Sequence, residues 1–161
     1  MNTCCFIGHR EINETKELIS QLFEIIEKLI VEENVDTFLF GSKSAFDSLC
    51  YGIVTKIKKK YPQIKRVYVR AVYPHIDGSY KNRLLTSYDD TYYPEKVAGA
   101  KKACYVKRNY EMIDKSHICV FYYSEKEAPA NRKSGTKVAL DYAVKKDKRI
   151  INVCTLNNIN N

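Results

Sequence analysis

Short apolar runs typical of β-strands alternate along the chain with longer stretches whose apolar residues recur at helical spacing. The strand-like runs lie at residues 3–7, 36–40, 66–72, 102–106, 117–123 and 149–153. The helical stripes lie at residues 14–33, 46–57, 108–115 and 136–145. Strands that alternate with helices favour a parallel sheet covered on both faces. We therefore predict an α/β fold, a single Rossmann-like domain with a mostly parallel sheet and helices on both faces.

One stretch, residues 73–100, follows neither periodicity and is rich in tyrosine. It contains Gly78, Pro94 and Gly99, and its five tyrosines lie at positions 73, 80, 88, 92 and 93. Long irregular segments inside compact domains are uncommon and often functional. Two interpretations stay open here: a lid or binding loop, and a surface excursion whose tyrosines pack on the sheet edge.

The chain is long enough to close one hydrophobic core. It has 161 residues, of which 45% are hydrophobic and 29% charged. We expect one domain over residues 1–156 and a frayed tail over residues 157–161. No run approaches the length of a membrane span and the first residues do not resemble a signal peptide, so we expect a cytoplasmic protein.

The formal net charge of +8 suits a polyanionic partner or a phosphorylated ligand. The lysine runs at 56–60 and 145–149 fall near predicted helix ends, where cations complement the helix dipole, so a nucleic-acid surface is not favoured. Six cysteines lie at positions 4, 5, 50, 104, 119 and 154, four of them (4, 5, 119 and 154) in strand-like runs. Their spacing does not suit a metal site, and we expect free thiols, no metal and no cofactor.

Three turns that bear glycine or hydroxyl groups lie close to strand-like runs and precede helical stripes. They are Gly8-His9-Arg10, Gly41-Ser42-Lys43-Ser44 and Ser134-Gly135-Thr136. In open α/β sheets ligands bind outside the carboxyl ends of the strands, where N–H groups and helix N-termini favour negative charge. The three turns therefore predict a nucleotide or sugar-phosphate site.

Individual residues of the first turn keep two interpretations each. Gly8 leaves room for a ligand or supports a positive φ. His9 offers a donor to the ligand or bonds a neighbouring loop, and Arg10 forks onto a phosphate or pairs with Glu11 or Asp47.

Two further groups also keep a structural alternative. Asp47, in the first turn of the second helix, accepts from a ribose hydroxyl or only complements the helix dipole. Ser134 and Thr136 face a phosphate or act as an ordinary helix N-cap.

Four segments together resemble the SLOG superfamily, which joins the DNA-processing Smf proteins and the cytokinin-activating "lonely guy" phosphoribohydrolases. The resemblance is to its small stand-alone bacterial and phage members and spans nearly the whole chain. The segments are Cys4-Cys5-Phe6-Ile7-Gly8-His9-Arg10, Gly41-Ser42-Lys43-Ser44-Ala45-Phe46-Asp47, Lys107-Arg108-Asn109-Tyr110-Glu111-Met112, and Ser134-Gly135-Thr136 through Asp141-Tyr142-Ala143.

The resemblance implies roles for two of these segments. Arg108, followed by Asn109, stands where the phosphoribohydrolases have their catalytic arginine, and Ser134-Gly135-Thr136 resembles their phosphate loop. Their glutamate, three residues after the loop threonine, is replaced here by Ala139. Asp141 would lie about 200° further round the helix. Glu111 and Asp114 on the preceding helix are weak substitutes, so we expect binding without turnover.

The resemblance implies that the protein binds a nucleotide or a nucleotide-derived signal such as an ADP-ribose-like molecule. It would act as a sensor or a sequestering protein in antiviral signalling or its evasion. Two alternatives stay open: a nucleoside-monophosphate N-glycosidase, against which Ala139 argues, and a DNA-binding module of the Smf type, for which an interleaved basic and aromatic surface is lacking. The expected partner is a nucleotide-like small molecule, with no membrane; nucleic acid is disfavoured and self-association is left open.

Overall fold

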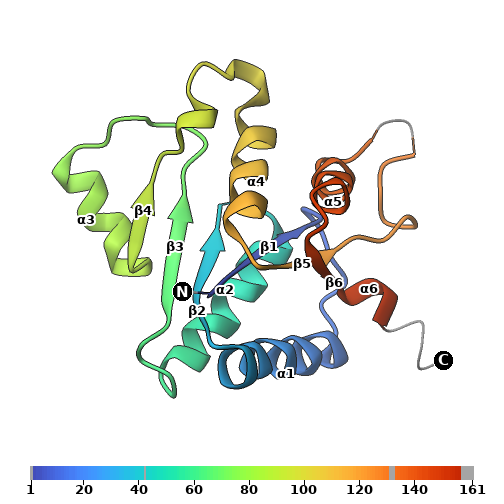
Figure 1. Ribbon diagram of the computed structural model, residues 1–161. Helices are drawn as coiled ribbons and strands as arrows, with labels where there is room; N and C mark the ends of the chain where they lie inside the picture. The colour runs from blue at the N-terminus through green and yellow to red at the C-terminus, as the bar shows by residue number, and fades with distance from the viewer. Residues whose placement is uncertain (1, 42, 131–132, 157–161) are drawn as a thin grey trace.

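A computed structural model describes residues 2–41, 43–130 and 133–156 of the chain. Within these residues the core is a six-stranded sheet in the order β4-β3-β2-β1-β5-β6, and all of its strand pairs are parallel. The strands are β1 (Asn2–Gly8), β2 (Val35–Phe40), β3 (Lys65–Val69), β4 (Asp90–Tyr92), β5 (Ile118–Tyr122) and β6 (Arg149–Asn152). The predicted Rossmann-like α/β class is confirmed (Figure 1).

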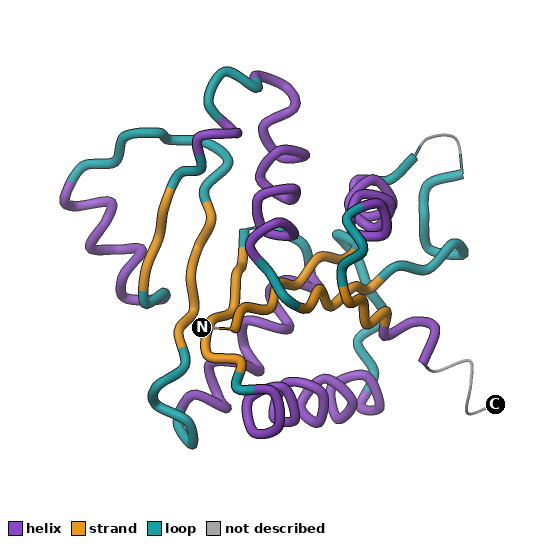
Figure 2. Tube along the Cα trace, viewed as in Figure 1, coloured by secondary structure: helices purple, strands orange, loops and turns teal. Residues whose placement is uncertain are grey.

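Helices connect the strands and cover both faces of the sheet (Figure 2). They are α1 (Lys16–Glu33), α2 (Ala45–Lys58), α3 (Gly78–Ser87), α4 (Cys104–Lys115), α5 (Gly135–Lys145) and α6 (Val153–Leu156), with the 3₁₀ turns η1 (Glu95–Val97) and η2 (Lys101–Ala103). One hydrophobic cluster joins α1 and α2 to one face, and a second joins α4 and α5 to the other.

Strand β1 shows why the sheet is buried on both sides. Cys4 and Phe6 belong to the cluster with α1 and α2, whereas Cys5 and Ile7 belong to the cluster with α4 and α5. Successive side chains of a strand point to opposite faces, so an uninterrupted apolar run fills two cores at once. No helix in the described part of the chain is long and apolar enough to cross a membrane.

The capping residues of α1 explain its bounds. The Thr15 hydroxyl accepts a hydrogen bond from the Leu18 N–H at 3.1 Å, which satisfies one of the free donors of the first turn. At the other end Asn34 adopts a left-handed conformation with φ of 55°, and β2 begins at the next residue.

The sequence interpretation was wrong in three places. Residues 78–87 form helix α3, and Asp90–Tyr92 adds the edge strand β4 within the stretch expected to be irregular. Residues 102–106 belong to η2 and to the start of α4 and form no strand. The last strand ends at Asn152, so Cys154 lies in α6 rather than in a strand.

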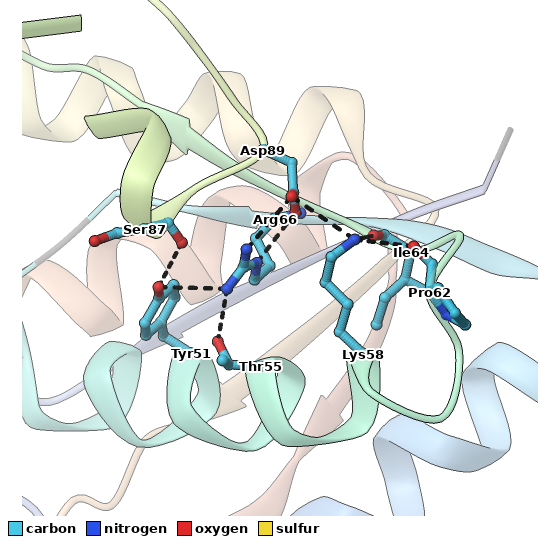
Figure 3. A network of polar contacts seen from close by, with 8 residues as sticks. All are labelled: Tyr51, Thr55, Lys58, Pro62, Ile64, Arg66, Ser87 and Asp89. Carbon is cyan, nitrogen blue, oxygen red and sulfur yellow. Dashed lines mark hydrogen bonds and ion pairs between the residues drawn. The ribbon is translucent and has the colours of Figure 1, made fainter. Parts of the chain in front are cut away.

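A network of polar contacts fastens the segment between β3 and β4 to helix α2 (Figure 3). Arg66 donates from its main-chain N–H and its Nε to the Asp89 carboxylate, at 2.8 and 3.1 Å. The hydroxyl of Tyr51 on α2 donates to the carbonyl of Ser87 at the end of α3. These contacts hold the end of the segment against α2 and β3, and its role stays a prediction.

The tyrosines of this segment divide into packed and exposed ones. The ring of Tyr88 lies 5.0 Å from that of Tyr51 and 5.1 Å from that of Tyr68, against the sheet edge. Tyr73 is 58% exposed and has a positive φ of 61°. The six cysteines, all of which the structure describes, are free thiols as predicted; the expected frayed tail, residues 157–161, lies outside the described residues.

Candidate functional site

The strand order places a change of direction between β1 and β5. The chain runs outward from β1 through β2 and β3 to β4, then crosses to β5 on the other side of β1. In doubly wound sheets ligands bind at this point, outside the carboxyl ends of the strands. The turn after β1 and the loop after β5 flank this point.

His9 bridges these two segments. Its ring is 7% exposed, and the Ser124 main-chain N–H donates to its Nε2 at 3.0 Å. The Ser124 carbonyl oxygen lies 3.2 Å from the same Nε2, so both main-chain groups of Ser124 face this nitrogen. The rings of Tyr122 and Tyr123 lie 5.9 and 5.5 Å away. Of the two interpretations of His9, bonding to a neighbouring loop is confirmed.

Gly8 is required by packing inside the protein. A Cβ at this position would lie 2.4–2.6 Å from Cβ, Cγ and Cδ1 of Phe46, which is fully buried at the start of α2. The φ of Gly8 is not positive, so that part of the expectation is wrong. Arg10 is exposed and, among the described residues, forms no ion pair, which corrects the pairing considered for it with Glu11 or Asp47.

The second turn is held by hydrogen bonds at the start of α2. The Ser44 hydroxyl accepts from the Asp47 N–H at 3.0 Å, and Asp47 Oδ1 accepts from the Gly41 N–H at 3.3 Å. Asp47 is only 3% exposed, so its carboxylate closes the turn from inside. Lys43 is exposed, and Ser42 lies outside the described residues.

The side chain of Arg108 extends from helix α4 to this turn. Its side chain is 5% exposed, one of its terminal nitrogens donates to the Gly41 carbonyl, and its Nε donates to the side-chain oxygen of half-buried Asn109 at 3.3 Å. A Cβ on Gly41 would lie 2.5 Å from Arg108 Cδ. The missing side chain of Gly41 therefore leaves room for the arginine.

The electrostatic setting of Arg108 is that of a buried cation. Burial lowers its pKa from the ordinary value, and the nearby Tyr68 and Asp47 oppose that shift. Within the described ranges no carboxylate forms an ion pair with it. Among the described residues its guanidinium is bonded to two neutral oxygens, which leaves positive charge available at the carboxyl end of β2.

The third turn forms an ordinary helix N-cap. The Ser134 hydroxyl accepts from the Lys137 N–H at 3.0 Å. Gly135 is exposed, its φ is not positive, and a Cβ there would meet no atom within 4 Å. Thr136 is buried behind it at 7% exposure. The N-cap interpretation of Ser134 is therefore confirmed. Neither the backbone conformation nor the packing requires a glycine at position 135.

The acids that the enzyme alternative would need are placed elsewhere. Ala139 is 1% exposed within the core beneath α5. Asp141 forms ion pairs with Lys133 at 2.6 Å and Lys137 at 3.0 Å. These hydrogen bonds hold the pKa of the Asp141 carboxyl below its ordinary range.

Glu111 and Asp114 line a cavity of about 570 Å³ beside β4 and η1. Lys96 pairs with both of them, at 3.5 and 2.5 Å. A single lysine thus faces both carboxylates within that cavity. Among the described residues, no group of three or more metal-ligating side chains could hold a metal ion.

Sequence reasoning missed Arg70, the residue that follows β3. It is 8% exposed and its Nε has no hydrogen-bond partner. The available signal is that Arg70 lies inside the strand-like run at residues 66–72, where it follows the buried Val67 and Val69.

Comparison with known proteins gives one informative relative. No family model matches the chain. The chain is 31% identical over 145 residues to a protein of Bacillus subtilis (strain 168) described as "Uncharacterized SPbeta prophage-derived protein YoqJ". The similarity covers 80% of this chain and 81% of that protein. The chain therefore belongs to the family of the prophage-derived protein YoqJ.

Proposed function

We propose that the protein is a SLOG-type domain that binds a nucleotide or a nucleotide-derived, ADP-ribose-like signal at the carboxyl edge of its sheet. The observation that carries this proposal is Arg108, a buried cation without a carboxylate partner in the described part of the chain. A phosphate would supply the negative charge that the protein does not, through charge-assisted hydrogen bonds.

The neighbouring turns support the same position. The Ala45 N–H donates to the Arg10 carbonyl at 2.8 Å, which ties the turn after β1 to the start of α2. Arg10 and Lys43 are exposed on these two turns and add positive charge beside the helix N-terminus. The positive end of the α2 dipole adds to their attraction for an anion.

The role we propose is binding without turnover. Cleavage of an N-glycosidic bond needs a carboxylate to activate water or to stabilise an oxocarbenium-like centre. Ala139 lies in the core, and Asp141 is held by two lysines. A protein that binds without cleaving would act as a sensor or a sequestering protein, and the prophage origin of its relative fits a role in antiviral signalling or its evasion.

The test is calorimetric titration and thermal unfolding of the full chain with AMP, ADP-ribose, cyclic ADP-ribose and NAD. A ligand that binds only the folded state adds about 2.7 kcal/mol of stability at a hundredfold excess over Kd. Arg108→Met is expected to weaken binding by about tenfold or more, since a hydrogen bond to a charged group contributes about 1.5–3 kcal/mol.

The matched control is Lys59→Met, which removes one exposed positive charge at the far end of α2. An equal loss of affinity in both variants would point to general basic charge and to a nucleic-acid partner. No response to any of the four compounds would reject the nucleotide proposal. Release of free base, followed by chromatography and abolished in Arg108→Met, would favour the N-glycosidase.

A further inference from the structure

A second cavity opens at the carboxyl ends of β3 and β4. Its volume is about 290 Å³, and it is lined by Arg70, Pro74, His75, Ile76, Lys81 and Thr91. The lining contains an arginine, a lysine and a histidine but no aspartate or glutamate. It comes from the end of β3, the loop that follows it, the first turns of α3, and β4.

Arg70 is fixed at the main chain and unpartnered at the side chain. Its N–H donates to the Tyr92 carbonyl at 2.9 Å, continuing the β3–β4 ladder by one bond. The residue is 92% buried, because its exposed fraction is 8%. Its Nε is buried and has no hydrogen-bond partner among the described residues.

The nearest acids in the sequence are engaged with the main chain. The Asp77 carboxylate accepts from the Tyr80 N–H at 2.7 Å and caps α3. Asp90 Oδ1 accepts from the N–H of Thr91 at 2.7 Å. Neither lines the cavity, so neither compensates Arg70.

A buried guanidinium without an acceptor is unfavourable in the free protein. Burial removes the water that would satisfy its Nε donor, and no described residue replaces that water. Such a group is retained where a ligand brings the missing acceptors. Arg70, Lys81 and His75 together present two permanent positive charges and one ring that can donate, which suits an anion with more than one negative charge.

We propose that this cavity is a phosphoryl-binding site. The Arg70 guanidinium donates hydrogen bonds to two phosphate oxygens, and Lys81 and His75 donate to the third. This site goes beyond the nucleotide site at Arg108 and does not depend on it. A doubly charged phosphate monoester fits the lining better than a carboxylate, because the lining carries two cations and no acid.

The test measures binding of inorganic phosphate to the full chain by calorimetry, in a phosphate-free buffer at constant ionic strength. Arg70→Met is expected to weaken phosphate binding by about tenfold or more. Lys81→Gln, an exposed position, is expected to weaken it severalfold and to leave the fold intact. Lys65→Gln is the matched control: it removes one exposed charge at the amino end of the same strand and should bind phosphate as the wild type does.

Thermal unfolding separates a ligand site from a structural arginine. Without phosphate, Arg70→Met should melt at the wild-type temperature or above it, because it removes a buried N–H donor that has no acceptor. Added phosphate should raise the melting temperature of Arg70→Met less than that of the wild type. If the circular dichroism spectrum shows that Arg70→Met is unfolded, the phosphate affinity of Lys81→Gln tests the proposal instead.

Four results would overturn the proposal. They are no phosphate binding by the wild type, wild-type affinity in both pocket variants, equal binding of acetate, and a loss of phosphate binding in Arg108→Met that is not seen in Arg70→Met. The third would assign the cavity to carboxylates, and the fourth would move phosphate to the other site. The nucleotide titration is a separate test, because it measures the binding of nucleotides rather than of inorganic phosphate.

Discussion

Replacing Gly8 with alanine tests whether this glycine serves packing rather than a ligand. The added Cβ would lie 2.4 Å from Phe46 Cδ1, 2.5 Å from Cγ and 2.6 Å from Cβ. Carbon atoms prefer separations of about 3.5–4.0 Å, so Phe46 would have to move by about 1 Å or more. The clashing atoms include the root of the side chain, and Phe46 is fully buried, so a rotamer change alone does not relieve the contact.

The expected cost is about 3 kcal/mol, the upper end of the usual range for an overpacked core. Urea unfolding followed by circular dichroism measures it, as a midpoint lowered by about 1.5 M if the slope is about 2 kcal/mol per M. Phe46→Ala deletes two of the three nearest atoms. In that background Gly8→Ala should cost only about 1 kcal/mol, a coupling of about 2 kcal/mol.

Gly52→Ala is the matched control, because Gly52 lies inside the same helix as Phe46 and a Cβ there meets no atom within 4 Å. It should stabilise the protein by about 0.5–1 kcal/mol, since alanine favours a helix interior. Packing against Phe46 does not explain Gly8 if Gly8→Ala costs less than about 1 kcal/mol or costs the same with and without the Phe46 ring.

Three further outcomes are expected. Burial by itself would raise the pKa of Asp89, but hydrogen bonds from Arg66 hold it below the ordinary value; the pair therefore stabilises the fold above about pH 4 and loses this effect as the pH falls through the lowered pKa. Asp89→Asn should cost about 1 kcal/mol in urea unfolding at pH 7 and progressively less in acid, and a constant difference between pH 7 and pH 2 would contradict this. Ser134→Ala should lower the unfolding free energy by about 1 kcal/mol through the lost N-cap, and an unchanged melting temperature would count against the cap. Brief iodoacetamide labelling at neutral pH should modify Cys104 before Cys154, because burial raises the pKa of Cys154 to about 11. The four buried thiols should react only after unfolding. Early labelling of one of them, detected by mass spectrometry, would contradict its burial in the core.

The elements with long apolar patterns were predictable from the sequence, and those without such patterns were not. β1 and β5 are buried on both faces, which makes each of them a continuous apolar run. α3 has no buried residue, so no stripe marks it. The buried face of α4 begins with Arg108 and includes Glu111, so its start looked like a strand rather than a helix.

The candidate site was predictable in position but not in its contacts. Turns at the carboxyl ends of parallel strands follow from the strand order. The partner of His9 lies 115 residues away at Ser124. The atoms that leave no room for a side chain at Gly8 belong to Phe46 in α2, with α1 and β2 between the two residues in the chain. Such long-range pairs depend on how the helices pack, and no local spacing encodes them.

The place of β1 in the middle of the sheet has a consequence for synthesis on the ribosome. One side of this strand pairs with β2, which follows within 40 residues, but its other side pairs Cys4 with Ile118. At about 5–20 residues per second, on the order of ten seconds separate the appearance of the two partners. During that interval β1 presents an unpaired apolar edge, and only the arrival of β5 can close it. Folding of the sheet is therefore completed only after β5 has been made, and β1 to β4 are the part that most needs protection from aggregation until then.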